Sequence, residues 1–180
     1  MRVITGIARG RKLEPPKGTN TRPTSEMVKE AVMSMIQFEI EGANFLDLYA
    51  GCGQMGIEAL SRGAHRCVFV DNSREAIELI RRNLDHTRFT SSSLVATSDV
   101  NIWLKNARGP FDIAFIDPPY EQETLAKTLE RLSPLMRDSG IILVESLLKT
   151  AMPERAGNFT LRREYRYGKT KITRYEAVDN

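Results

Sequence analysis

Residues 45–56 read FLDLYAGCGQMG and carry the clearest fold signal in the chain. An apolar strand pattern leads into a glycine-rich loop, and the residues that follow continue at helical spacing. Gly51 and Gly53 let the backbone turn tightly and approach a ligand without a Cβ collision, while the start of the helix offers free N–H groups. The stretch therefore predicts a strand, a ligand-binding loop and a helix in succession.

The order of strand then helix repeats along the chain. Strands are predicted at 45–48, 66–70, 94–97, 111–116 and 141–144, and helices at 54–62, 73–84, 99–106 and 122–132. This alternation predicts an α/β fold with a doubly wound, mostly parallel sheet that binds ligands beyond the carboxyl ends of its strands. Segments 159–167 and 171–178, joined around Gly168, predict an antiparallel strand pair at one end of that sheet.

The amino-terminal segment, residues 1–22, is predicted to be a basic β-hairpin extension that precedes one domain, residues 23–180. The strands of this hairpin fall at 3–5 and 11–13. The chain has 180 residues and a mass of 20.3 kDa, which suits a single domain with a full core.

Several classes of protein are disfavoured by composition. The sequence has no apolar run of membrane-spanning length and no basic-then-apolar leader, so we expect a soluble cytoplasmic protein. No metal site is expected, because no metal-binding spacing is formed by Cys52, Cys67, His65 and His86.

The formal net charge of +3 is unevenly distributed. Residues 1–22 hold six basic residues against one acidic residue, and residues 155–180 hold seven against three. Basic ends around an acidic centre favour a polyanion held by the termini, although solvated charged strand faces give the same pattern. The candidate phosphate-binding residues are Arg9, Arg11, Lys12, Lys169 and Lys171.

The glycine loop has two candidate ligands. A G-x-G-x-x-G pattern is formed by Gly51, Gly53 and Gly56. Asp71 ends the next strand, where it can accept both hydroxyls of a ribose. The pattern serves dinucleotides and S-adenosylmethionine alike, and the upstream acid Asp47 suits the methionine part of the latter. Asp99 follows the third strand, where it either contacts an adenine edge or caps the next helix.

The tetrapeptide Asp117-Pro118-Pro119-Tyr120 follows the predicted strand 111–116. The double proline holds the chain extended and removes two N–H donors, so the Asp117 carboxylate and the Pro118 carbonyl can each accept a hydrogen from one planar –NH₂ group. Tyr120 can stack on the ring that bears this amine. The tetrapeptide predicts a clamp for a nucleobase amine, which suits methyl transfer and not a dehydrogenase; the alternative is a proline turn whose Tyr packs in the core.

Together these motifs resemble the RsmD family of bacterial 16S ribosomal RNA guanine-N2 methyltransferases. The resemblance runs from the basic hairpin to the last strand, although the family more usually has Ser or Thr where this chain has Cys52 and Gln54. The motifs that match the family are Arg22-Pro23-Thr24, Asp47 to Gly51 with Gly53, and the stretches 58–64, 117–120 and 167–170.

The resemblance implies a class I S-adenosylmethionine-dependent, Rossmann-like methyltransferase domain over residues 23–180, with S-adenosyl-L-methionine as cofactor. It also implies the substrate, one guanine of 16S rRNA in an assembled or nearly assembled 30S subunit, because Asp-Pro-Pro-Tyr does not itself separate guanine N2 from adenine N6 or cytosine N4. Arg22 would contact the cofactor carboxylate or an RNA phosphate, or else anchor the cap of the next helix, Thr24 or Ser25. The alternatives are another planar amine, in DNA adenine or protein glutamine, and a non-catalytic RNA-binding assembly factor.

Overall fold

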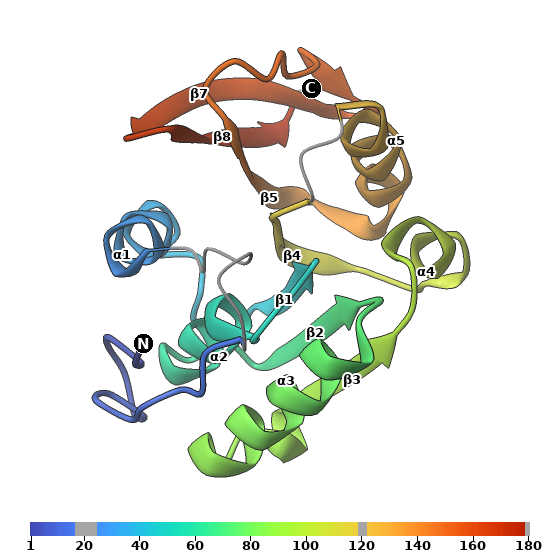
Figure 1. Ribbon diagram of the computed structural model, residues 1–180. Coiled ribbons are helices and arrows are strands. Elements are labelled where there is room, and N and C mark those ends of the chain that lie inside the picture. The colour runs from blue at the N-terminus through green and yellow to red at the C-terminus, as the bar shows by residue number, and fades with distance from the viewer. Residues whose placement is uncertain (17–24, 119–121, 179–180) are drawn as a thin grey trace.

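A computed structural model describes residues 1–16, 25–118 and 122–178 (Figure 1). Within these residues the helices are α1 (Glu26–Met35), α2 (Gln54–Ser61), α3 (Arg74–Thr87), α4 (Val100–Asn106) and α5 (Gln122–Leu132). The strands are β1 (Asn44–Leu48), β2 (Arg66–Asp71), β3 (Ser93–Thr97), β4 (Phe111–Ile116), β5 (Met136–Leu147), β6 (Arg155–Ala156), β7 (Phe159–Tyr167) and β8 (Thr170–Ala177). Short 3-10 helices precede β3 and β5, at Thr90–Ser92 and Ser133–Leu135.

The strands form one eight-stranded sheet in the order β3-β2-β1-β4-β5-β8-β7-β6. Strands β1 to β5 run parallel to their neighbours among themselves, whereas β8 lies antiparallel between β5 and β7. The predicted doubly wound, mostly parallel sheet with an antiparallel end is therefore confirmed. The strand order reverses between β1 and β4, which is the kind of switch point where open α/β sheets bind ligands.

Strand β5 is longer than predicted, because it covers Met136–Leu147 and not only 141–144. Backbone pairing supports both added parts, since Met136 pairs with Phe111 of β4 and Leu147 pairs with Thr170 of β8. The apolar pattern detected only the buried centre of the strand, because exposed polar residues occupy its beginning.

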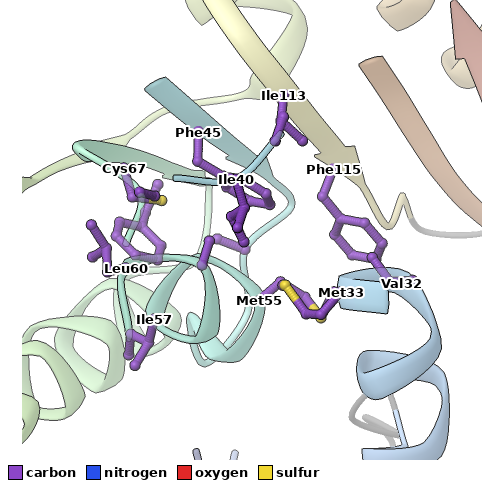
Figure 2. Packing of buried hydrophobic residues seen from close by; sticks show 14 of the residues in the cluster. Val32, Met33, Ile40, Phe45, Met55, Ile57, Leu60, Cys67, Ile113 and Phe115 are labelled. Atoms are coloured by element: carbon purple, nitrogen blue, oxygen red, sulfur yellow. The ribbon is translucent and has the colours of Figure 1, made fainter. Parts of the chain in front are cut away.

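Helices cover both faces of the sheet (Figure 1). Helices α1, α2 and α3 pack on one face, and α4 and α5 pack on the other. Figure 2 shows part of the first core, where side chains of α1 and α2 meet those of β1, β2 and β4. Since successive strand residues point to opposite faces, the face that receives Phe45 and Phe115 also receives Asp47 and Asp117.

Helix α1 is fixed at both ends. At its start the Ser25 hydroxyl accepts a hydrogen bond from Val28 N at 3.2 Å, so Ser25 is the N-cap, one of the two residues predicted for that role. At its end the guanidinium of Arg174 in β8 donates to the Met35 carbonyl oxygen. The helix therefore bridges the amino-terminal region and the antiparallel end of the sheet.

The amino-terminal arm, defined as residues 1–14, is held mainly by contacts with α2. Its predicted hairpin is reduced to one antiparallel bridge between Arg2 and Lys12. The amides of Ile4 and Thr5 donate to the Glu58 carboxylate of α2 at 2.8 and 2.9 Å. Because these amides bind a side chain, they are not available to extend the strand pairing.

Gly6 lets the arm approach α2 closely. Its φ is +85°, and a Cβ atom there would lie 1.7 Å from the Ser61 carbonyl oxygen. Ile7 N donates to that same oxygen at 2.9 Å, and the Ser61 hydroxyl accepts from Ala8 N at 3.0 Å. The arm therefore has a defined position on the domain, beside α2 and below α1 in Figure 1.

One buried acid, Glu58, joins the arm, α1 and α2. Its carboxylate accepts from Arg62 Nε at 2.9 Å and lies 3.5 Å from Lys29 Nζ of α1. Lys29 and Glu58 are both fully buried, and Lys29 also donates to the Arg2 carbonyl oxygen at 2.6 Å. Burial lowers the pKa of Lys29, and the neighbouring Glu58 opposes this shift. The two buried charges thus compensate each other, with backbone groups completing their hydrogen bonds.

Candidate cofactor and amine-binding site

Acidic side chains gather at the carboxyl edge of the parallel strands. Asp47 of β1 pairs in register with Phe69 of β2 and with Phe115 of β4. Asp71 and Asp117 follow those two partners by two residues, so they share the face of Asp47 and lie nearer the edge. We call the edge lined by these three carboxylates the acidic rim.

Asp71 binds the glycine loop from the end of β2. Its Oδ2 accepts from Gly51 N at 2.9 Å, and its Oδ1 accepts from Ser73 N at 2.9 Å. The residue is half-buried, and each carboxylate oxygen has a second lone pair for another donor. The geometry is therefore compatible with the predicted contact to ribose hydroxyls.

Asp47 lies deeper than Asp71, against the first turn of α2. Its side chain is buried, and Oδ2 accepts from Gly56 N at 2.9 Å. Burial raises the pKa of Asp47 well above its ordinary value; the hydrogen bond from Gly56 opposes the shift, and the charges of Asp117 and Asp71 add to it. A positively charged ligand group at the acidic rim would favour the ionised carboxylate.

The three glycines of the loop have different roles. Gly51 and Gly53 have φ values of +56° and +77°, a region that other residues seldom adopt. A Cβ atom on Gly51 would meet open space, whereas one on Gly56 would lie 2.3 Å from the Phe69 ring and 2.5 Å from Cys67 Sγ. Gly56 thus permits α2 to pack tightly on β2, and the space beside Gly51 lets a ligand approach the backbone.

Asp99 caps a helix in this structure. Its Oδ1 accepts from Ile102 N at 2.9 Å at the start of α4, which is one of the two roles expected from the sequence. The residue is exposed and follows β3, the neighbour of β2 at the edge of the sheet. Contact between its second oxygen and an adenine stays a prediction.

Asp117 and Pro118 follow β4 next to the switch point. Asp117 N donates to the Leu48 carbonyl oxygen at 3.3 Å, which extends the pairing with β1 by one residue. Removal from water, together with the charge of Glu145 in β5, raises the pKa of Asp117 to about 8. A carboxyl group that titrates near neutral pH suits proton transfer.

Two predicted site residues, Tyr120 and Arg22, lie outside the described residues. Stacking by Tyr120 and both roles of Arg22 therefore stay predictions. The part of the amine clamp that the structure describes consists of Asp117 and the buried Pro118.

Most of the predicted phosphate-binding residues lie at the surface. Arg9, Lys12 and Lys169 are exposed. Arg11 is half-buried, and its Nη1 donates to the His86 carbonyl oxygen at 3.1 Å, which ties the arm to the end of α3.

Lys171 departs from its predicted role. Its side chain is only 7% exposed, and its Nζ lies 2.6 Å from Glu164 Oε1. Lys171 pairs in register with Ser146, the residue after Glu145, so it points to the face opposite Glu145. The structure therefore places Lys171 in an ion pair instead of at a phosphate-binding surface.

Sequence reasoning missed two acids. Glu145 directly follows the apolar run 141–144, just as Asp117 directly follows the run 111–116. An acid at the carboxyl end of a predicted strand could therefore have indicated Glu145 as a site residue. Glu58 gave no such signal, because its partners come from the arm and from α1, far away in sequence.

The arrangement discriminates between the two candidate cofactors. The pyrophosphate of a dinucleotide would bring negative charge to the acidic rim, where it meets carboxylates. S-adenosylmethionine instead brings positive charge, and the space beside Gly51 admits a ligand to the backbone. The fold and the rim thus define a class I S-adenosylmethionine-dependent methyltransferase, with S-adenosyl-L-methionine as its cofactor.

Comparison with known proteins identifies the family. A family model described as "Conserved hypothetical protein 95" matches residues 1–176, and the chain belongs to this family. A relative in Bacillus subtilis, "Putative rRNA methyltransferase YlbH", is 36% identical over 181 residues, which cover 98% of each chain. "Ribosomal RNA small subunit methyltransferase D" of Escherichia coli is 32% identical over 98% of this chain and 89% of that protein. The resemblance to the RsmD family is thereby confirmed.

A solved structure shows the same fold. "Putative methyltransferase yhhF from Escherichia coli" has a TM-score of 0.88 and 32% identity, with coverage of 98% of this chain and 97% of that chain. In the described part of the chain, no helix combines the length and the apolar character needed to cross a membrane. The same residues contain no group of three or more His, Cys, Asp or Glu side chains placed to hold a metal ion.

Proposed function

We propose that this protein transfers a methyl group from S-adenosyl-L-methionine to the exocyclic N2 amine of one guanine in 16S rRNA. The observation that carries the proposal is the Asp117 carboxylate, which follows β4 at the acidic rim next to β1. The names of two relatives, which assign them to rRNA methylation, support an RNA substrate.

The clamp prepares a poor nucleophile. The lone pair of a base amine is delocalised into the ring, and acceptance of one hydrogen each by the Asp117 carboxylate and the Pro118 carbonyl turns that lone pair out of the ring plane. When bound, S-adenosyl-L-methionine supplies an electrophilic methyl group. N2 gains this group and loses one proton, while the carboxylate stabilises the positive charge that develops on N2.

Asp117 is suited to accept the released proton. Its pKa of about 8 makes the carboxylate a stronger base than an ordinary aspartate. Below that pH the free site holds a proton, which must leave before both oxygens can act as acceptors. Positive charge at the rim favours this loss.

Selection of one guanine requires contacts outside the clamp, because the clamp holds only a single flipped base. Arg9 and Lys12 on the arm and Lys169 at the turn between β7 and β8 are exposed cations that can bind phosphates. The proposed partner is 16S rRNA in the assembled or nearly assembled 30S subunit, in the cytoplasm.

Mass spectrometry of 16S rRNA nucleosides tests the proposal. Cells with the wild-type protein, cells without it and cells with Asp117→Asn are compared. We expect N2-methylguanine at one position only where the wild-type protein is present. Unchanged methylation in cells that lack the protein would contradict the proposal, and transfer of labelled methyl by the purified protein to DNA adenine or protein glutamine would point to a different amine.

A further inference from the structure

Glu145 is placed beside Asp117 by the pairing of β4 with β5. The register joins Ile116 with Val144, and Asp117 and Glu145 are the next residues of the two chain segments. Neighbouring strands lie about 4.8 Å apart, and paired residues of parallel strands share a face. The two acidic side chains are therefore neighbours at the carboxyl edge of the sheet.

The same face carries the acidic rim. Phe115 and Leu143, two residues before Asp117 and Glu145, belong to the core beneath α1 and α2. On its other side Glu145 pairs with Ile172 of β8, which is fully buried. Glu145 is thus a half-buried acid that lies between Asp117 and an apolar side chain.

Two adjacent carboxylates have a definite chemical preference, because they accept hydrogen bonds and donate none. Guanine presents two adjacent donors on its Watson–Crick edge, the N2 amine and N1–H. Adenine and cytosine instead place an unprotonated ring nitrogen beside their amine, and its lone pair would face a carboxylate. A pair of acceptors therefore fits guanine and disfavours the other two bases.

We propose that Glu145 selects guanine: its carboxylate accepts the N1–H hydrogen bond while Asp117 accepts from the N2 amine. This inference rests on the proposed guanine-N2 function, and it supplies the base selectivity that Asp-Pro-Pro-Tyr lacks. Glu145 determines specificity at the clamp and is not itself the acceptor of the methyl group or of the released proton.

The ionisation of the pair agrees with this role. Burial and the charge of Glu145 raise the pKa of Asp117 to about 8, so without a ligand the Asp117 carboxyl tends to hold a proton at neutral pH. A guanine that donates to both side chains supplies hydrogen bonds in place of the proton on Asp117. Asp47 of β1 is the further acid whose charge interacts with Asp117, whereas Ile172 contributes no charge from β8.

Base analogues test the selection. Reconstituted 30S subunits carry either guanine or 2-aminopurine at the methylated position, and 2-aminopurine keeps the N2 amine but has a lone pair at N1. We expect the wild type to prefer guanine by about 10²-fold or more in kcat/KM, because a site built for a donor rejects an analogue that lacks it. Glu145→Leu should lower kcat/KM far more for guanine than for 2-aminopurine, so the preference disappears.

Ser146→Ala is a matched control. Ser146 is the next residue of β5, it faces the opposite side of the sheet, and its buried hydroxyl has no hydrogen-bond partner among the described residues. This variant should keep the wild-type preference for guanine. Glu145→Gln is the second variant, for use if Glu145→Leu does not fold. The glutamine amide can donate to N1 of 2-aminopurine, so this variant should have higher activity on that analogue than the wild type.

The outcomes separate the inference from the proposed function. A wild type that methylates both bases equally, or a Glu145→Leu variant that loses activity equally on both, would overturn the role of Glu145 and leave the proposed function standing. Failure of the wild type to methylate guanine-containing subunits at N2 would instead remove the proposed function itself.

Discussion

Two acids in this molecule occupy contrasting surroundings. Around Glu58, the amides of Ile4 and Thr5 and the side chains of Arg62 and Lys29 supply hydrogen bonds and positive charge. Around Asp117, no hydrogen bond from the described residues reaches the carboxylate, and the charge that acts on it comes from another acid. Among the described residues, one carboxylate is compensated by donors and positive charge, and the other is not.

This contrast distinguishes an acid that fixes parts of the fold to each other from an acid that is suited to bind a ligand. A compensated charge is stable without a ligand, so Glu58 can fix the arm and α1 on α2. An uncompensated carboxylate at the end of a strand is strained electrostatically until donors or positive charge arrive from a ligand. The same chemical group therefore holds the structure together in one region and prepares a site in the other.

The largest expected effect is a loss of stability when the compensated acid, Glu58, is removed. Glu58→Ala should lower the free energy of unfolding by about 3–5 kcal/mol, because it leaves Lys29 buried without its anion. Denaturant unfolding followed by circular dichroism measures the change. Combination with Lys29→Met should recover part of the loss, and a single variant as stable as the wild type would show that Glu58 contributes no compensation.

The uncompensated acid should behave in the opposite way. Asp117→Asn should lower kcat for methyl transfer by about 10²–10³, since one preorganised charged group is removed. Its stability at neutral pH should be equal to or higher than that of the wild type, because the cost of protonating a carboxyl group on folding disappears. Steady-state methyl transfer measures kcat, and thermal unfolding of the same preparation measures stability. Near-normal turnover would exclude the clamp mechanism.

Asp71→Ala sharpens the comparison, because Asp71 is only partly compensated. We expect S-adenosyl-L-methionine to bind more weakly by about 2–3 kcal/mol, the scale for hydrogen bonds to a charged group. Titration calorimetry measures the affinity, and circular dichroism verifies that the variant is folded. Unchanged affinity in a folded variant would place Asp71 outside the cofactor site.

Two glycines of the arm offer a matched pair. Gly6 and Gly10 have φ values of +85° and +82°, so alanine at either position costs about 1–2 kcal/mol of backbone strain. Only at Gly6 would the new Cβ also collide with the Ser61 carbonyl oxygen. Gly6→Ala should therefore destabilise the protein more and raise the KM for 30S subunits several-fold above that of Gly10→Ala. Equal effects would show that close contact with α2 does not position the arm.

The last prediction concerns pH. The pKa of folded Asp117 is about 8, against an ordinary value of 3.8, so the folded state binds more protons between these values. The free energy of unfolding contributed by this group is therefore highest at low pH and falls as the pH rises toward 8. This slope should be smaller in Asp117→Asn, whereas kcat/KM of the wild type should increase as the carboxylate forms. Parallel pH curves for stability in the two proteins would contradict the raised pKa.

Local patterns in the sequence predicted the elements and the strand ends that carry chemistry. Strand β4, helix α5 and strand β7 occupy the predicted residues 111–116, 122–132 and 159–167, because apolar periodicity depends on residues that are close in sequence. The glycines and acids of the rim were likewise visible, since the carboxyl ends of parallel strands meet at one edge.

Tertiary structure alone decided which charged groups meet and which face water. The ion pair of Lys171, the attachment of the arm through Glu58 and the position of Glu145 beside Asp117 all depend on contacts between segments distant in sequence. An acidic or basic residue gives the same sequence signal whether it is solvated, paired in the interior or held uncompensated at a site. Strand register and packing set its neighbours, and those neighbours determine its charge state and its role.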